Sequence, residues 1–380
     1  MDRERGGIAS IIEKQTGREL VDRNASHAFG QFVYERFDKT QLQAYQKACA
    51  HIDTVYESNA RAVVGWNIRA DLPQTPSRTN AVPRCREMIV QRDEVVQTAV
   101  LHADAAGLIA AKVTTTITLP NDAPWLEIAI QLDDKRPDYW PENGSFCFPV
   151  NAAKPQFRIG RLGAVLDPAK DFARGANRTF GYVNTGGIIA DANGQGMAIC
   201  PLDHGIMSFG DRGLGVIDPD YVPTTPIAKV SLFNNFWTIN FPYWIQGTVH
   251  SRVRVWPTRN LGPASLVVAA LEALTPVLTA VADGPAGQLP ATAQGLATSR
   301  PGVRLISFAQ NSDGPGNLLR LWEQSGETGE LTVTLPAGAK FATATRVNLR
   351  GEKTGEVKSI KGGKIVLNLD AYAPVSFILQ

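Results

Sequence analysis

The sequence lacks the long apolar run that a membrane-spanning helix or a secretory leader needs. Its first ten residues, MDRERGGIAS, are charged and polar, so they hold no apolar core of a signal peptide. No stretch approaches the roughly 20 apolar residues of a spanning helix. We therefore expect a cytoplasmic protein that does not enter a membrane.

Histidine and cysteine are scarce, with five and four residues in a chain of 380. The cysteines are widely separated, and they show no C-x-x-C pair and no histidine at metal-ligand spacing, which favours buried free thiols. The sequence also has no phosphate-binding glycine loop, no G-x-S-x-G element and no dinucleotide fingerprint. We expect no metal and no cofactor.

An excess of positive or negative charge is missing as well. The net charge is +2 and there is no basic block, so nothing favours binding to nucleic acid. What is present is a globular composition, with 44% hydrophobic and 19% charged residues. A chain of this length exceeds what one core usually organises, so two domains are expected.

Most of the chain has the pattern of β-strands separated by turns. Apolar residues alternate or cluster with β-branched residues, and Gly, Pro, Asn and Asp mark the turns. Consecutive strands without helices between them predict antiparallel sheets stacked as a sandwich. The segments are a hairpin at 8–21, a short helix at 41–60, and strands from about 62 to 257.

A composition change divides the chain near residue 260. Residues 264–281 are rich in Ala and Leu at helical spacing, with Pro276 inside, and a Gly/Pro loop follows. Six short strands in 303–380 then predict a small immunoglobulin-like or jelly-roll-like sandwich. The predicted organisation is a large β domain (1–260), a helical and loop linker (261–300) and a small β domain (301–380).

Several segments, in this order, resemble the β region of family 38 glycoside hydrolases, the α-mannosidase-like enzymes, in a bacterial branch. The resemblance covers nearly the whole chain. It implies an all-β fold, a large antiparallel supersandwich of the galactose-mutarotase-like type followed by the small immunoglobulin-like sandwich. The segments are GGIASIIEKQTGRELVD, AFGQFVYERF, KRPDYWPENGSFCFPV, PQFRIGRLGAVLDP, MAICPLDHG, FNNFWTINF, LLRLWEQSGETGELTVTLP and RVNLRGE with YAPVSFIL.

The family's own chemistry has no counterpart in this chain. In the resembling enzymes an N-terminal (β/α) domain holds a divalent metal on His and Asp and supplies an Asp nucleophile. The resemblance lies in the β region alone, so none of the metal ligands of that domain, nor its nucleophile, can be transferred to this sequence. The resemblance carries over only the loops of the β region that approach the sugar.

The stretch KRPDYWPENGSFCFPV (135–150) holds the first candidate residues. Its aromatic, carboxylate and amide side chains are of the types that line sugar sites. Two carboxylates about 5 Å apart would suit a retaining glycosidase and a wider gap an inverting one. The alternative is a corner in which Arg136 pairs with Asp138 and the aromatics cover the core. The candidates are Asp138 and Glu142 as catalytic residues, with Tyr139, Trp140 and Asn143 as sugar contacts.

Two further segments complete the candidate site. Asp203 and His204 end a strand, where a carboxylate beside an imidazole could do acid–base work or simply begin a turn. The run FNNFWTINFPYW (233–244) is the densest in aromatics, and it is either the border of a groove or core packing. Its sugar-contact candidates are Trp237, Asn240 and Trp244. Glu142 is predicted to lie at the rim of the main pocket, within reach of Asp203 or His204.

Three functions fit these observations. The chain is a free-standing glycosidase of hexosides that uses the loop carboxylates, or a non-catalytic β module or subunit of an α-mannosidase-like enzyme. The third is a mutarotase-type epimerase, which needs a His and a Glu flanking a pyranose. All three imply a carbohydrate partner. The face that would meet a catalytic domain is expected to be apolar and to drive self-association as a homo-oligomer.

Overall fold

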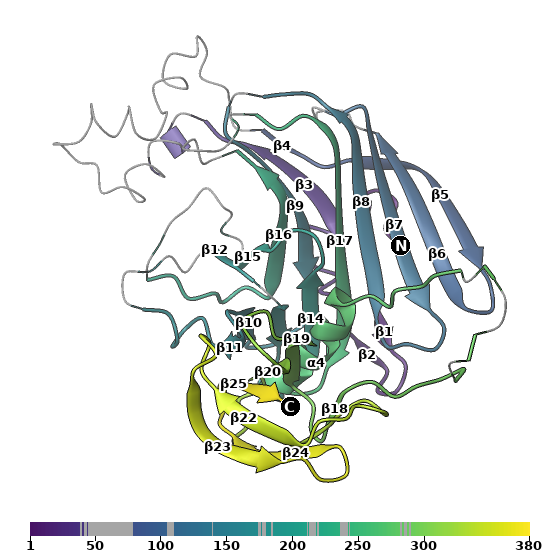
Figure 1. Ribbon diagram of the computed structural model, residues 1–380. Helices are drawn as coiled ribbons and strands as arrows, with labels where there is room; N and C mark the ends of the chain where they lie inside the picture. Colours follow the sequence, from purple (N-terminus) through teal and green to yellow (C-terminus); the bar gives the residue numbers. More distant parts are fainter. Residues whose placement is uncertain are drawn as a thin grey trace. The chain divides into compact units, whose positions relative to one another are not determined.

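The computed structural model describes residues 1–38, 40–41, 44, 79–104, 110–138, 140–173, 176, 180–183, 185–210, 212, 218, 220–235, 242, 244–281, 283–284, 287–288 and 290–380 (Figure 1). The chain forms two compact units. Unit 1 comprises residues 1–161 and 166–261, and unit 2 comprises residues 162–165 and 262–380.

The larger sheet of unit 1 has nine strands, and its pairs from β10 to β5 are antiparallel (Figure 1). Their spatial order differs from their order in the sequence, because β17 returns to lie between β14 and β8. The order is β11 (Ala164–Leu166), β10 (Gln156–Arg161), β13 (Gly186–Ala190), β14 (Gly196–Pro201), β17 (Gly247–Thr258), β8 (Leu126–Lys135), β7 (Lys112–Pro120), β6 (Val96–Asp104) and β5 (Arg84–Arg92).

The second sheet of unit 1 has six strands and places β9 beside β3, a strand that lies more than a hundred residues earlier. A short hairpin, β1 (Ile12–Glu13) with β2 (Arg18–Glu19), stands near the N-terminus and is smaller than the predicted 8–21 hairpin. The order of the six strands is β12 (Phe180–Tyr182), β15 (Ile206–Phe209), β16 (Ile227–Asn234), β9 (Glu142–Pro149), β3 (Gln31–Arg36) and β4 (Thr79–Ala81).

One hydrophobic core in unit 1 takes side chains from both sheets. Phe146 and Phe148 of β9 lie in the same buried cluster as Ile128 and Ile130 of β8, and none of the four has exposed surface. Alternate residues of each strand point inward, as period two requires. The all-β sandwich predicted from the sequence is therefore confirmed in the described part of the chain.

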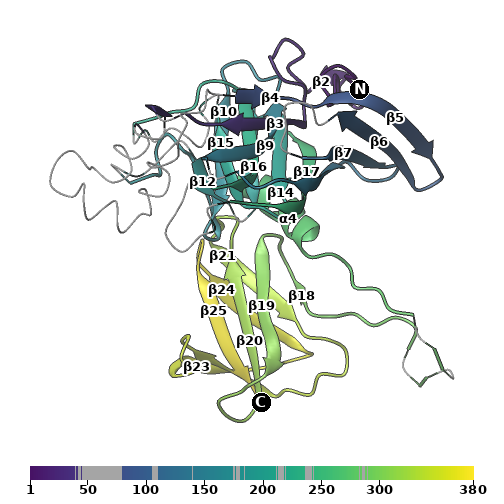
Figure 2. The same ribbon diagram turned by 90° about the horizontal axis from the view of Figure 1, so that it is seen from above.

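Unit 2 holds a three-stranded and a five-stranded sheet around a core of aliphatic residues and Phe377 (Figure 2). The six predicted strands are present, and β23, whose sequence KTGEVKS is mostly polar and exposed, was not predicted. The strands are β18 (Ala297–Thr298), β21 (Gly329–Thr334) and β24 (Lys364–Leu369), then β19 (Val303–Gln310), β20 (Asn317–Glu323), β25 (Pro374–Leu379), β22 (Thr343–Val347) and β23 (Lys353–Ser359).

The helix predicted for 264–281 is shorter than expected. Helix α4 spans Pro263–Leu274, with a proline in its first turn where no hydrogen bond is lost. It ends before Pro276, because a proline disfavours helical backbone in the residue that precedes it. The connection from 275 to 296 follows, and Val277, Leu278 and Val281 in it are 88%, 94% and 98% exposed. The helix predicted at 41–60, apart from residues 41 and 44, and the start of the strand region predicted from about 62 lie outside the described residues.

Strand β5 forms one edge of the nine-stranded sheet. Ile89 and Val90 on this strand are 41% and 48% exposed, so the edge carries apolar side chains, and among the described strands none pairs with its outer side. The self-association expected from the sequence stays a prediction.

Candidate functional site

The stretch that opens at Lys135 is a crossing from one sheet of unit 1 to the other. Lys135 is the last residue of β8 and Glu142 is the first residue of β9. Asp138 and Trp140 lie in the connection between them. Glu142 is thus a strand residue, on the same core-facing side of β9 as Phe146 and Phe148.

A polar cluster forms around Glu142, and we call its members, Tyr34, Lys135, Glu142 and Asn235, the Glu142 cluster. Lys135 Nζ lies 2.5 Å from Glu142 Oε1, and the Tyr34 hydroxyl donates to Oε2 at 2.8 Å. The ammonium also donates to the carbonyls of Ile245 and Arg136, at 2.8 and 3.1 Å. All three donors of the lysine are therefore used.

The Glu142 carboxylate is sealed from solvent. Glu142 has no exposed surface, and Lys135 retains 3%. Burial raises the pKa of Glu142 to about 7, against the opposing effects of the Lys135 ammonium and of the hydrogen bonds from Lys135 and Tyr34. Burial and the neighbouring carboxylate likewise raise the pKa of Tyr34. The prediction that Glu142 lies at a pocket rim is wrong, because its oxygens face these two partners inside the sandwich.

Asp138 is held by a cation, but not by Arg136, which the corner alternative named as its partner. Arg36 Nε lies 2.7 Å from Asp138 Oδ2, so the partner comes from the end of β3. Asp138 Oδ1 accepts from the backbone N–H of Trp140 at 3.0 Å. The amide of Asn235 donates to the carbonyls of Asp138 and Trp140, which fixes the connection against the end of β16.

Asn143 points to the opposite face of the six-stranded sheet. Its amide donates to Glu35 Oε2 at 3.1 Å and its carbonyl oxygen accepts from Ser231 at 2.9 Å, so the row crosses three adjacent strands. Asn143 is 2% exposed. Gly144, next along, lies against Phe233, whose ring atoms would stand 2.4 Å from an added Cβ.

Asp203 and His204 lie far from Glu142. Both oxygens of Asp203 bind Arg252, whose side chain and backbone N–H all donate to it. Lys135 pairs with Gly247, five residues before Arg252 on β17. At about 3.3 Å per residue these two backbone positions on β17 are roughly 16 Å apart, so Glu142 and Asp203 are held by cations at different places along the strand. The predicted approach of Glu142 to Asp203 or His204 is therefore wrong.

His204 is half-buried beside this pair. Burial lowers the pKa of His204, against the attraction of Asp203, so the imidazole is held toward its neutral form. Burial also pushes the pKa of Asp203 upward, but the hydrogen bonds from Arg252 outweigh it and leave it below its ordinary value. Within the described residues, the Nδ1 atom of His204 has no hydrogen-bond partner.

The aromatic candidates are mostly covered or not described. Trp140 is 7% exposed and belongs to the buried residues of unit 1. Trp244 is partly buried and adjoins Ile245, whose carbonyl receives Lys135. Tyr139, Trp237 and Asn240 lie outside the described residues.

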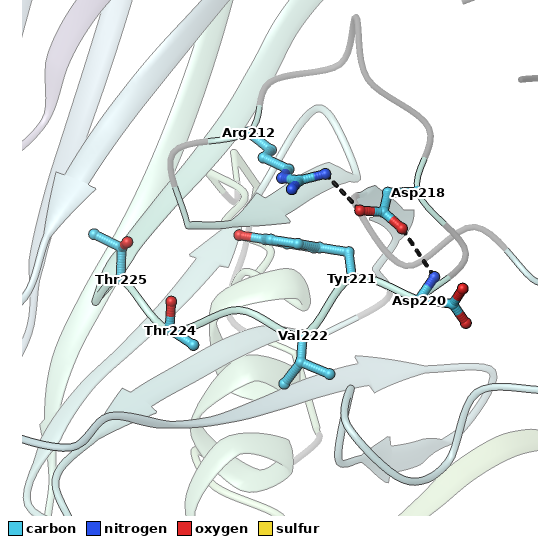
Figure 3. A pocket seen from close by; sticks show the side chains of 7 residues that line it. All are labelled: Arg212, Asp218, Asp220, Tyr221, Val222, Thr224 and Thr225. Atoms are coloured by element: carbon cyan, nitrogen blue, oxygen red, sulfur yellow. Dashed lines mark hydrogen bonds and ion pairs between the residues drawn. The ribbon is translucent and has the colours of Figure 1, made fainter.

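A hollow of about 420 Å³, which was not predicted, is lined by residues of the connection from β15 to β16 (Figure 3). Arg212 pairs with Asp218 and its guanidinium lies 5.0 Å from the centre of the Tyr221 ring. The Tyr221 hydroxyl donates to the carbonyl of Phe209 at 3.0 Å. The lining residues are Arg212, Asp218, Asp220, Tyr221, Val222, Thr224 and Thr225, and we call this the Tyr221 hollow.

A repeated pentapeptide is the sequence signal that could have found this hollow. The pattern Pro-Asp-Tyr-x-Pro occurs as PDYWP at 137–141 and as PDYVP at 219–223. The first copy contains the candidate Asp138, and the second contains Asp220 and Tyr221. The aromatic and carboxylate content that marked the first copy was therefore present in the second as well.

Two further observations concern the described residues alone. No group of three His, Cys, Asp or Glu side chains there is placed to hold a metal ion. None of the helices there has both the length and the apolar character that crossing a bilayer requires.

Comparison with known proteins gives a likeness of fold. No protein-family model matches the sequence, and no curated protein matches it. A crystal structure of a glycosyl hydrolase family 38 protein from Enterococcus faecalis matches all of this chain with a TM-score of 0.64 and 10% identity. That of an α-mannosidase from Enterococcus faecalis V583 does so with a TM-score of 0.65 and 10% identity.

The chain spans 42% and 41% of these two proteins. The family 38 resemblance seen in the sequence is thus confirmed for the fold. At 10% identity the likeness extends to architecture and not to site residues.

Proposed function

We propose that this chain is a non-catalytic β module of an α-mannosidase-like glycoside hydrolase, which contributes carbohydrate-binding surface but neither the acid nor the nucleophile. The observation that carries the proposal is the sealing of Glu142, the carboxylate with the strongest sequence case for catalysis. A group with no exposed surface cannot touch a substrate, and its two oxygens are occupied by Lys135 and Tyr34.

Two more features support the same assignment. Asp203 is bound by Arg252, which lies five residues along β17 from the position that pairs with Lys135, so Asp203 and Glu142 do not face one glycosidic bond. The fold likeness is to enzymes more than twice the length of this chain. The Glu142 cluster then serves to join the two sheets of the sandwich.

A free-standing glycosidase remains as a second candidate because Asp138 is not fully sealed. Its side chain is 12% exposed and that of Arg36 is 31% exposed, so this pair reaches the surface. In this alternative Asp138 is the catalytic carboxylate. No observation favours a mutarotase, since His204 and Glu142 do not flank a common space.

Hydrolysis and binding assays separate these functions. The purified full chain is offered a panel of nitrophenyl hexosides, with and without chelator, and binding of the methyl hexosides is measured by calorimetry. We expect binding without turnover in both conditions. Turnover that survives the chelator and falls by a factor of about 10² in Asp138→Asn would establish the glycosidase instead.

A further inference from the structure

We propose that the Tyr221 hollow is a binding site for one neutral hexopyranose ring, with Asp220 and Tyr221 as its principal contacts. This inference rests on the proposed function, because it assigns the carbohydrate-binding surface of the module to a definite place. The hollow belongs to unit 1, and its described lining comes from the connection between β15 and β16 (Figure 3).

The hollow is held open by contacts that fix its aromatic ring. The hydroxyl of Tyr221 is anchored on the carbonyl of Phe209, and the Arg212 guanidinium lies over the ring. Gly210, with φ of +81°, makes room for that hydroxyl, which would stand 1.9 Å from an added Cβ. A ring fixed at both its face and its hydroxyl needs little reordering when a ligand arrives.

The charges in the hollow favour a neutral ligand. Arg212 is neutralised by Asp218, and the backbone N–H of Asp220 donates to the same Asp218 carboxylate at 3.0 Å. Among the described residues the Asp220 side chain has no ion pair, and Figure 3 shows it pointing away from Arg212. A carboxylate without an ion pair repels anions, while it accepts strong hydrogen bonds from hydroxyl groups.

The remaining lining suits a ligand with many hydroxyl groups. Thr224 and Thr225 carry hydroxyls that donate and accept, while Val222 and the Tyr221 ring offer apolar surface. A sugar ring presents hydroxyls at its edge and C–H groups on its faces. Its polar and apolar parts therefore match the threonine hydroxyls and the apolar surface of the hollow. A volume of about 420 Å³ lies at the small end of ligand sites, about 300–1,000 Å³, and so favours one ring over a long chain.

The two Pro-Asp-Tyr-x-Pro copies show why the second is the binding copy. In the first, Asp138 is engaged by Arg36 and by the backbone of Trp140. In the second, the corresponding Asp220 is exposed. Asp138 is therefore bound within the fold, whereas Asp220 has its side chain exposed.

Ligand binding by the full chain tests the site. Saturation-transfer NMR and calorimetry are run with methyl α-D-mannopyranoside and methyl β-D-galactopyranoside on the wild type, Asp220→Ala and Tyr221→Leu. Asp122→Ala, which removes an exposed carboxylate elsewhere in unit 1, is the matched control. We expect at least about tenfold weaker binding in the two hollow variants and wild-type binding in the control. Thermal melting confirms that each variant is folded, and Asp220→Asn repeats the test should Asp220→Ala not fold.

The outcomes separate the two levels of the proposal. Wild-type affinity in folded Asp220→Ala and Tyr221→Leu would place the sugar elsewhere. It would overturn the assignment of the site to the Tyr221 hollow, while the proposed function would stand. Failure of the wild type to bind any hexoside in the panel would overturn both. Tighter binding of glucuronate than of the methyl hexosides would contradict the neutral ligand.

Discussion

Glu142 in unit 1 and Glu323 in unit 2 are both fully buried, yet their surroundings shift the pKa of the two carboxyl groups in opposite directions. Glu142 faces a single lysine and a tyrosine hydroxyl. Glu323 accepts the backbone N–H groups of Ser325, Gly326 and Tyr372 at 2.8, 2.9 and 2.7 Å, together with the Ser325 hydroxyl. The nearest cation to Glu323, Arg300, stands at 3.8 Å.

The pKa directions follow from these partners. Burial pushes both pKa values upward. For Glu142 burial prevails and the pKa rises to about 7. For Glu323 the hydrogen bonds from the Ser325 hydroxyl and from the backbone of Tyr372 and Ser325 outweigh burial and lower the pKa. At Glu323 the hydrogen bonds outweigh the effect of burial on the pKa, whereas at Glu142 the lysine and the tyrosine do not.

The largest effect is expected from breaking the ion pair of unit 1. Glu142→Ala leaves the Lys135 ammonium buried without its carboxylate, and we expect a loss of about 3–5 kcal/mol in the free energy of unfolding, measured in urea. Asp203→Ala is the control, because its pair with Arg252 is partly exposed and is worth at most about 1 kcal/mol. If the two variants lose the same free energy of unfolding, the buried pair contributes no more to stability than the partly exposed pair does.

The same pair offers a second variant that sharpens the result. Lys135→Met combined with Glu142→Leu removes both charges and keeps an apolar volume between the sheets. We expect this double variant to recover most of the loss of Glu142→Ala, since well-packed apolar residues often replace a buried ion pair without penalty.

A smaller effect is expected at Glu323. Glu323→Gln keeps one accepting oxygen but turns an amide N–H₂ toward backbone donors, and we expect a loss of about 2 kcal/mol. Glu327→Gln is the matched control, because that side chain is 57% exposed and its ion pair with Arg300 is loose. Equal melting temperatures for the two variants would show that the backbone donors do not hold Glu323.

The smallest effect is the dependence on pH, and its sign differs between the units. A raised pKa means that the folded state binds the proton more tightly than the unfolded state does. The contribution of Glu142 to the free energy of unfolding is therefore full below pH 4.5 and is lost as pH rises through about 7. The contribution of Glu323, whose pKa is lowered, is full above 4.5 and is lost on acidification below that value.

Urea unfolding across pH 5–7 measures this contrast. The stability difference between wild type and Glu142→Gln should shift against the wild type as pH rises, by on the order of 1–2 kcal/mol. The difference between wild type and Glu323→Gln should stay flat over the same range. A flat curve for both would mean that Glu142 is ionised throughout.

The fold was predictable because the local sequence pattern of its strands indicates which residues are buried. Segments such as 126–135 and 364–369 alternate apolar and polar residues, and alternation is sufficient to predict a half-buried strand. The failures have local causes too. Pro276 shortened the predicted helix, and β23 has too few apolar residues to be recognised.

The candidate site was less predictable because its partners are distant in sequence. The Asn235 amide bonds backbone groups of Asp138, Trp140 and Glu142, three candidates that are close in sequence. It could not show that Tyr34, 108 residues earlier, would bind the same carboxylate. Register between β3 and β9 decides that contact, and register comes from the packing of whole strands.

The connection between α4 and β18 has a practical consequence for work on the purified protein. Its aliphatic residues Val277, Leu278 and Val281 stand almost wholly in water, and such chain is the first to be nicked by a protease. Thermolysin, which cuts before bulky aliphatic residues, should open the chain before Leu278. The N-terminal product keeps every strand from β1 to β17, and the C-terminal product keeps β18 to β25. A preparation that shows two bands on a gel would therefore still contain both β-sheet cores intact.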